Sequence, residues 1–228
     1  MRARASSLHE MLWPDSEAEF ATIASAWTDE MILQMLGLVW DGFDQMKAQH
    51  FQGIDFSQRI EQLERGLTDL HMDEISLLWK QRRDGFESFI PKHEAWEFRS
   101  RKDASAMPPS TDIGFVLVAN RSLRWSVEAK VLEHPADVTR YLADLTDKYL
   151  TGRGSPLSLE AALAGYLRTG LPDETFLHLQ ARLGQPLKTS MAFPNRSHRV
   201  SRHQRRLAGR REKVPFACHH LILDLTNR

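Results

Sequence analysis

The chain has 228 residues, a length that suits one compact domain with a helical extension better than two large domains. Hydrophobic residues make up 42% and charged residues 26%, values of a globular protein that exclude a disordered chain. Lys and Arg together number 30, as do Asp and Glu, so the net charge of zero predicts no general attraction to a polyanion and any such attraction must be local. The single cysteine, Cys218, excludes an internal disulfide, suits a reducing compartment and is expected in the core.

Targeting and membrane segments are not predicted. The N-terminus has basic residues, but no apolar segment follows them as in a secretory signal. No later stretch approaches the roughly 18 apolar residues of a membrane span. We therefore expect a cytoplasmic protein without a membrane partner.

The first third of the chain has helical periodicity. Apolar residues recur at three- and four-residue steps over residues 15–49, which predicts a helix or a helix pair. A second pattern runs from Phe56 to Trp79, with Asp55 or Ser57 as its expected N-cap. Residues 1–83 are thus predicted to form an N-terminal helical region, and 86–96 a further helix that is kinked or restarted at Pro91.

The period changes after the loop predicted over residues 100–111. Residues 113–118 and 123–132 are rich in β-branched and aromatic side chains, and a short polar link over 119–122 joins them. This pattern predicts an antiparallel hairpin. Because side chains alternate along a strand, Glu128 and Lys130 should share one face of the second strand, and Trp125 and Val127 the other.

Helices are predicted again behind the hairpin. Residues 136–150 carry an apolar stripe at helical spacing and end before the glycine-rich residues 152–154. Residues 158–170 predict another helix, with Ser158 as its N-cap, and residues 217–225 a last, well-buried strand. The expected fold class is α/β, with residues 84–228 forming the domain that contains the hairpin.

Two carboxylates and a lysine of this hairpin have the chemistry of a metal-dependent phosphodiesterase. Asp112 comes just before the first strand and Glu128 lies within the second, so strand pairing can bring their carboxylates together. Mg²⁺ or Mn²⁺ prefers such oxygen ligands, to which the carbonyl of Ala129 could be added. Lys130 could then hold the attacking water or stabilise charge on the phosphate.

Asp112 followed by Glu128-Ala-Lys130, with apolar β-runs around both, resembles the PD-(D/E)XK restriction-endonuclease-like superfamily. Residues 108–112, the helix from 136 and the turn at 152–156 are also similar to nuclease-like proteins of bacteria and phages, some linked to defence against foreign DNA. The resemblance covers residues 84–228. It implies a mixed central sheet with a helix before the hairpin and one behind it, and metal-dependent hydrolysis of DNA. Thr111 stands where the family has proline, which leaves the Asp112 ligand intact.

The same resemblance implies that a helical acidic residue can complete the metal site. Glu94, in the helix expected before the hairpin, would take this place, and Glu97 is its substitute. The competing interpretation of Glu128 and Lys130 is a pair on a solvated sheet face, which would contribute little to stability. The apolar character of residues 125–132 favours a central strand instead. Charged side chains are rarely buried in such a strand unless they have a partner or a function.

A basic segment follows at residues 196–213, with eight Lys or Arg and one acid. Clustered arginines bind backbone phosphates without reading sequence, so the segment predicts a nucleic-acid contact. A solvated loop or a disordered linker is the equal alternative. His198 could also serve phosphate binding or proton transfer. The predicted nucleic-acid-binding residues are Arg196, Arg199, Arg202, His203, Arg205 and Arg206.

The sequence supports three hypotheses about function. The first is a deoxyribonuclease that uses Asp112, Glu128 and Lys130, with RNA as a second candidate substrate and a second copy or a defence-system subunit as a partner. The second is a catalytically inactive nucleic-acid-binding or assembly subunit, and the third a purely structural protein. A zinc site at His219 and His220 is rejected, because no second ligand pair with zinc spacing accompanies them.

Overall fold

The structure, a computed structural model, describes residues 17–82, 84–96, 110–207 and 212–226. Its strands are β1 (Phe89–Trp96), β2 (Ser110–Leu117), β3 (Arg124–Leu132), β4 (Glu160–Leu167), β5 (Lys188–Thr189), β6 (His198–Arg206) and β7 (Lys213–Asp224). Its helical segments are α2 (Glu17–Ala24), α3 (Asp29–His50), the 3₁₀ turn η1 (Phe51–Gly53), α4 (Ile60–Gln81), α5 (Val138–Asp144), the π-helical turn η3 (Leu145–Tyr149) and α6 (Pro172–Leu183).

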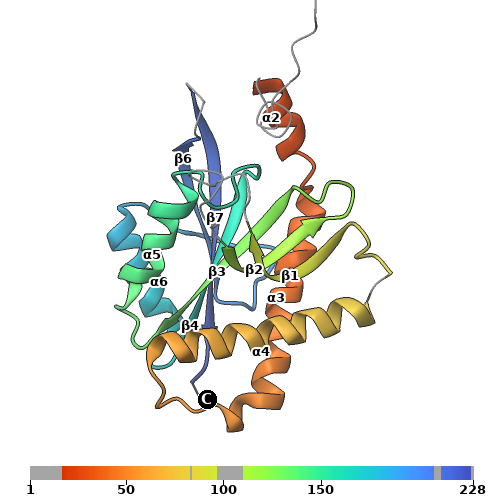
Figure 1. Cartoon of the computed structure of the whole chain (residues 1–228). Helices are drawn as coiled ribbons and strands as arrows, with labels where there is room; N and C mark the ends of the chain where they lie inside the picture. The colour runs from red at the N-terminus through yellow and green to blue at the C-terminus, as the bar shows by residue number, and fades with distance from the viewer. Residues whose placement is uncertain (1–16, 83, 97–109, 208–211, 227–228) are drawn as a thin grey trace, which may run out of the picture.

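Within these described residues, the seven strands form one mixed sheet in the order β1-β2-β3-β4-β7-β6-β5 (Figure 1). The pairs β1–β2 and β2–β3 are antiparallel, β3–β4 and β4–β7 are parallel, and β7–β6 and β6–β5 are antiparallel again. Helices flank the sheet and helices also make up the N-terminal part, so the predicted α/β class is confirmed. The predicted hairpin is confirmed as β2 and β3.

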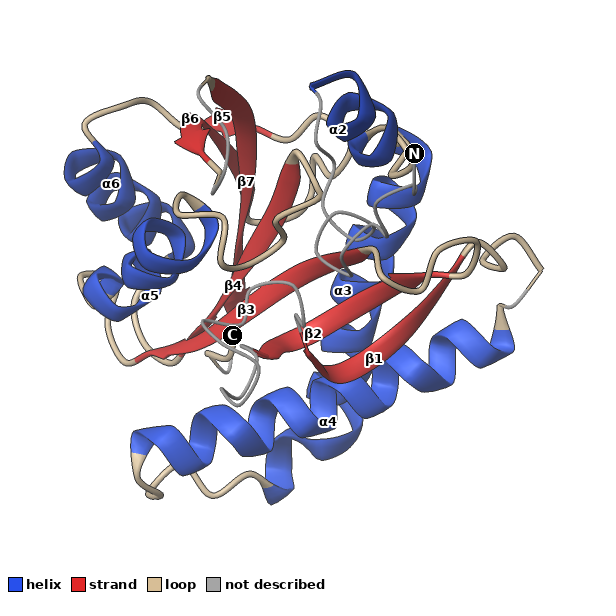
Figure 2. Cartoon of the chain, turned by 45° about the horizontal axis from the view of Figure 1, so that its top comes forward, coloured by secondary structure: helices blue, strands red, loops and turns tan. Residues whose placement is uncertain are grey.

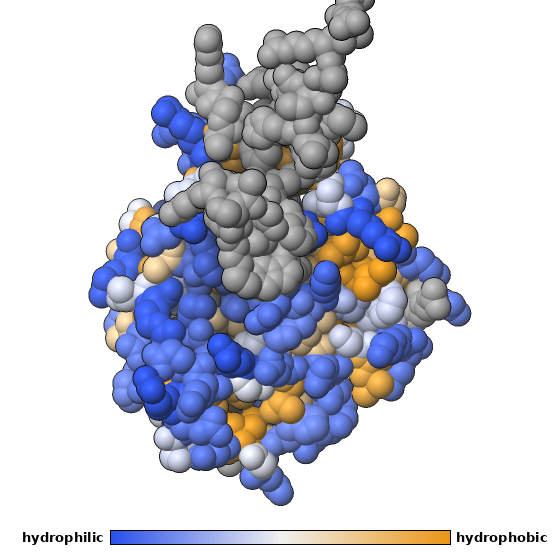
Figure 3. All heavy atoms as spheres, in the orientation of Figure 1, coloured by the Kyte–Doolittle hydropathy of each residue, from blue (hydrophilic) through white to orange (hydrophobic). Residues whose placement is uncertain are grey.

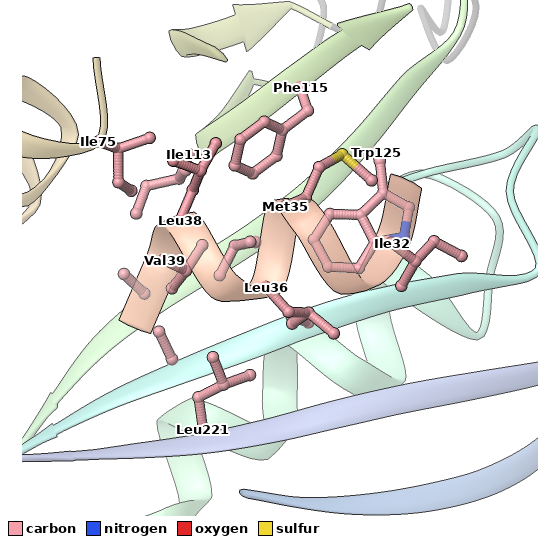
Figure 4. Packing of buried hydrophobic residues seen from close by; sticks show 14 of the residues in the cluster. Ile32, Met35, Leu36, Leu38, Val39, Ile75, Ile113, Phe115, Trp125 and Leu221 are labelled. Carbon is pink, nitrogen blue, oxygen red and sulfur yellow. The ribbon is translucent and has the colours of Figure 1, made fainter. Parts of the chain in front are cut away.

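Helices α3 and α4 cover one face of the sheet. The amphipathic pattern of α3 turns Met35 and Leu36 toward Trp125 of β3 and Leu221 of β7, all of them fully buried (Figure 4). Thr28 caps the N-terminus of α3, since its side chain accepts a hydrogen bond from the Met31 N–H. The N-terminal helices therefore share one core with the sheet.

Helices α5 and α6 cover the opposite face (Figure 2). Tyr141 and Tyr149 from α5 and η3 pack with Phe176 of α6 against a second buried cluster on this side of the sheet. Cys218 of β7 belongs to this cluster as a free, buried thiol, as predicted. Strand β3 thus lies between two helical layers.

Two predicted helices are strands. Residues 86–96 contain the edge strand β1 because Pro91 disfavours a helix but is tolerated at a sheet edge, where it faces Phe115 of β2. Residues 158–170 contain the central strand β4, in which Ala161 and Leu163 join the α5 side and Ala162 joins the α3 side. A parallel strand buried on both faces is a continuous apolar run, which periodicity alone does not distinguish from a helix.

Other boundaries differ less from the predictions. Asp55 and Ser57 bond to each other rather than capping α4, which begins at Ile60. Asp112 lies inside β2 and not before it, and β7 begins at Lys213. Of the loop predicted over residues 100–111, the last two residues belong to β2, and the others lie outside the described residues, as does the substitute ligand Glu97. The domain boundary near residue 83 stays a prediction.

The surface facing the viewer in Figure 3 is mostly hydrophilic, with small separate apolar areas. Across the described ranges, no helix combines the length and apolar character that crossing a membrane requires.

Candidate active site

The candidate site forms where β2 and β3 stop pairing. Their register runs from Val116 opposite Arg124 to Ile113 opposite Val127, and there the described pairing ends. Beyond that point, every second N–H group of β3 faces away from β4 and would have donated to the backbone of β2 if the pairing had continued. These N–H groups donate to side-chain carboxylates instead. The Ala129 N–H donates to Asp112 Oδ2 at 2.7 Å, and the Val131 N–H donates to an α4 carboxylate at 3.2 Å.

That α4 carboxylate belongs to Glu64, which the sequence interpretation did not single out. Glu64 Oε2 accepts from Val131, and Glu64 Oε1 lies 3.2 Å from Lys130 Nζ. The predicted helical acid, Glu94, is instead an exposed residue of β1 with a positive φ of 45°. The prediction of Glu94 on a helix before the hairpin is wrong, because that segment is a strand, and α4 supplies the helical acid.

Lys130 lies at the centre of the carboxylates. Its Nζ is 3.0 Å from Asp144 Oδ2 and 3.8 Å from Asp112 Oδ2, and it donates to the Ala129 carbonyl at 2.8 Å. Burial opposes its charge, but the carboxylates of Asp112, Asp144 and Glu64 outweigh burial, and the pKa of Lys130 is raised. Lys130 is therefore an ammonium group, suited to hold or stabilise negative charge.

Glu128 is almost completely buried, with 1% of its surface exposed. Burial raises the pKa of Glu128 to about 8, with the Asp112 carboxylate adding to the rise and Lys148 opposing it. Lys148 Nζ contacts Glu128 Oε2 and lies 3.0 Å from Asp144 Oδ1. Glu128 Oε1 has no hydrogen-bond partner among the residues that the structure describes.

This set of groups is compatible with a hard cation of limited protein ligation. No cluster of three or more His, Cys, Asp or Glu in the described residues is arranged to hold a metal ion. Mg²⁺, however, is commonly held by one or two carboxylates, with water and substrate phosphate as the other ligands. The unpartnered, buried Oε1 of Glu128 and the adjacent Asp112 carboxylate fit that mode.

A cavity of about 230 Å³, lined by residues of α4, β1 and β2, adjoins the site. Asp112 and Glu64 line its inner part, and Asp69 forms an ion pair with His93 at 3.2 Å on its wall. Glu61 and Glu94 also line the cavity. With these acids and one arginine, Arg65, in its lining, the cavity has an excess of negative charge, which favours cations.

Two further residues missed in the sequence come from the element behind β3. Asp144 ends α5 and Lys148 lies in η3, one helical step apart and on the side that faces Glu128 and Lys130. The pattern contained a hint, since Asp144 and Lys148 continue the stripe of Tyr141 and Leu145 toward the sheet. Buried charged residues at such positions need partners, which here are the charges of β3.

Half of the basic segment predicted over residues 196–213 is a strand, and residues 208–211 lie outside the described residues. Its residues 198–206 form β6, separated from β3 by β4 and β7 in the sheet. Arg196 forms an ion pair with Asp44, and Arg199 lies 2.9 Å from Asp173 and over the ring of Phe176. These two arginines are engaged with the protein itself.

The other predicted nucleic-acid-binding residues differ in their surroundings. Arg205 is 1% exposed and donates to backbone carbonyls, so it does not reach a phosphate backbone in this structure. His203 is partly buried and bonded to Ser201 at 2.7 Å. Arg202 and Arg206 are exposed on one face of β6. His198 is buried against His219, away from the hairpin residues of the site.

Asp112, Glu128 and Lys130 are thus brought together at one edge of β3, while the basic residues of β6 are not part of the same cluster. Comparison with family models, with curated proteins and with solved structures gave no match to this chain.

Proposed function

We propose that the chain is a metal-dependent nuclease that hydrolyses phosphodiester bonds in DNA. The observation that carries this proposal is the end of β2–β3 pairing, where the Asp112 carboxylate bonds to the Ala129 N–H. Ala129 lies between Glu128 and Lys130 in the sequence, so the three proposed site residues come together there. A helix before the hairpin, α4, and another behind it, α5, accord with the arrangement that the PD-(D/E)XK resemblance implies. DNA rather than RNA follows from that resemblance alone.

The residues have distinct roles in this proposal. Asp112 and Glu128 would hold Mg²⁺ or Mn²⁺, which when bound neutralises phosphate charge and makes a water more nucleophilic. Lys130, held within 4 Å of three carboxylates, keeps its proton and presents an ammonium group to the attacking water or to the phosphate oxygens. Glu64 restrains both Lys130 and the β3 backbone at Val131.

The test is cleavage of supercoiled and linear DNA with Mg²⁺, Mn²⁺ or EDTA, by the wild type, Glu128→Ala and Lys130→Ala. We expect metal-dependent cutting that both substitutions abolish, while Glu30→Ala, at an exposed position of α3, cuts normally. Cutting that persists in EDTA or in Glu128→Ala would refute the assignment. A parallel assay on RNA distinguishes the two nucleic acids.

A catalytically inactive nucleic-acid-binding or assembly subunit is the second candidate. One observation favours it: Lys148 already contacts the Glu128 carboxylate and Asp144, so a side chain of the protein itself occupies one oxygen of Glu128. This candidate predicts salt-sensitive DNA binding that is the same in Mg²⁺ and in EDTA, and no cutting.

A cytoplasmic location, a role in defence against foreign DNA and assembly with a second copy or a defence subunit complete the nuclease proposal.

A further inference from the structure

Two consecutive residues of the π-helical turn η3 hold Glu128. The Tyr149 hydroxyl accepts a hydrogen bond from the Glu128 N–H at 3.1 Å, and Lys148 Nζ contacts the Glu128 carboxylate. One turn of the chain therefore holds both the backbone and the side-chain end of the same residue. Single π-helical turns are rare and are frequent at functional sites, which directs attention to η3.

The Tyr149 hydroxyl lies in the ladder between β3 and β4. Besides accepting from Glu128, it donates to the Ala162 carbonyl of β4 at 2.9 Å and lies 3.3 Å from the Ser126 carbonyl of β3. The parallel pairing of the two strands begins at this level, with Val127 opposite Ala162. The hydroxyl thus takes the place of a backbone hydrogen-bond partner at the point where β3 begins to pair with β4.

The turn is itself held from a distant strand. Arg205 of β6 donates to the Tyr149 carbonyl at 3.1 Å and to the Ser155 carbonyl at 3.0 Å, and its guanidinium also contacts the Ser158 carbonyl. The group is fully enclosed and lies over the Phe216 ring, 4.3 Å from its centroid. Because the guanidinium bonds carbonyls of η3 and of the loop that follows it, a residue of β6 restrains the position of η3.

Asp144 completes the restraint on the side-chain end. It pairs with Lys148 through Oδ1 and with Lys130 through Oδ2, each at 3.0 Å. Lys148 is therefore held between two carboxylates, and the Glu128 carboxylate has one defined neighbour on the α5 side. The other oxygen of Glu128, Oε1, is buried and has no hydrogen bond from the described residues.

We propose that η3, anchored by Arg205, is a positioning element for Glu128, in which Tyr149 sets its backbone and Lys148 the direction of its carboxylate. The inference rests on the proposed function, because Glu128 matters there as a metal ligand. Groups that orient a ligand from behind commonly change metal affinity by 10–100-fold when they are removed. Tyr149 and Lys148 are positioning residues in this scheme.

The experiment compares Tyr149→Phe with Tyr141→Phe, each of which removes one buried hydroxyl oxygen. Tyr141 also donates to a β4 carbonyl, that of Leu163 at 2.9 Å, but its second partner is His220 and not Glu128. Mn²⁺ is the probe, and its binding to the full chain is followed by electron paramagnetic resonance of the free ion. We expect Tyr149→Phe to weaken Mn²⁺ binding by about ten-fold or more, and Tyr141→Phe to leave it unchanged.

A second readout does not depend on metal. The backbone amide resonance of Glu128, measured by NMR without added ions, should shift and exchange faster with solvent in Tyr149→Phe than in Tyr141→Phe. Equal Mn²⁺ affinity of the two variants, or an unmoved Glu128 amide, overturns the positioning role. If the wild type binds no Mn²⁺, the proposed metal site fails, and the amide alone then decides whether η3 positions Glu128.

Discussion

The Asp112 carboxylate accepts, at 2.7 Å, the hydrogen bond of the Ala129 N–H, which a longer β2–β3 ladder would have satisfied with backbone. An acidic side chain thus substitutes for a strand. The bond holds the Asp112 side chain against β3 and also satisfies a backbone donor that would otherwise lack a partner. Asp112 therefore has a structural role, as the acceptor for Ala129, and a proposed role as a metal ligand. Substitutions that keep the acceptor but remove the charge can separate the two roles.

Asp112→Asn should separate fold from function. The asparagine side-chain oxygen can still accept from Ala129, so we expect a free energy of unfolding close to that of the wild type. DNA cleavage should be lost, because the negative charge of the proposed metal ligand is gone. Asp112→Ala should lose cleavage and also about 1 kcal/mol of stability, since the Ala129 N–H loses its partner. Cleavage assays and urea unfolding of both variants measure these effects. Cutting by Asp112→Asn at the wild-type rate would remove Asp112 from the metal site.

Glu64→Gln should reduce cleavage by about 10–100-fold, the range found for outer groups of metal sites, because Glu64 holds Lys130 in place. The substitution removes the charge that Lys130 Nζ meets at 3.2 Å but keeps an oxygen for the Val131 N–H. Glu94→Gln changes the other candidate acid, an exposed β1 residue that also lines the cavity, and should reduce cleavage much less than Glu64→Gln does. Initial rates at saturating Mg²⁺ give the comparison. The reverse result would restore Glu94 as the acidic residue of the site.

Arg205→Met should destabilise the fold by about 1–3 kcal/mol for each buried carbonyl that is left without a hydrogen-bond donor. The carbonyls of Tyr149 and Ser155 would lose their donor in an enclosed position. Arg202→Ala, an exposed neighbour on β6, should change stability by less than about 0.5 kcal/mol. Urea unfolding provides both free energies. Similar small effects of the two substitutions would mean that Arg205 is not a structural anchor.

Acid should unfold the protein through its buried histidines. Burial lowers the pKa of His198 and of His220 to about 3, and that of His71 to about 4. Because these folded values lie below the unfolded value of about 6.5, the unfolded chain binds more protons below pH 6.5. Their contribution to stability is complete above that pH and is lost as the pH falls toward 3, by up to about 1.4 kcal/mol per unit for each histidine.

Substitution of single histidines checks this pH dependence. Free energies of unfolding measured from pH 7 to pH 4 should fall less steeply in His220→Gln than in the wild type. His178→Gln, at an exposed position of α6, should leave the slope unchanged. An unchanged slope in His220→Gln would contradict the assignment.

The hairpin and its charged face could be predicted because alternation along β3 is a local property. Glu128 and Lys130 do share the α5 side, where both meet charges of that layer. Strand β4 could not be recognised in the same way, since its two faces enter two different cores and no polar face marks a period of two. The short edge strand β1 was obscured by apolar spacing that also fits a helix.

The partners of the hairpin residues could not be predicted. Glu64 meets Val131 across 67 positions of sequence, and its place depends on how α4 packs beneath the sheet. Arg205 was grouped with its basic neighbours because composition does not show which arginine of an alternating strand points inward. The positions of both Glu64 and Arg205 depend on how whole helices and strands pack together. A single sequence indicates that packing only weakly.

The candidate site draws its charges from both helical layers, Glu64 from α4 on one side of the sheet and Asp144 with Lys148 from the α5 side. Neither layer alone can assemble the cluster around Lys130. A chain that has docked only one of them would expose its core but lack a complete site. If the proposed function holds, full activity would therefore require both helical layers to be docked on the sheet, because the charges around Lys130 come from both of them.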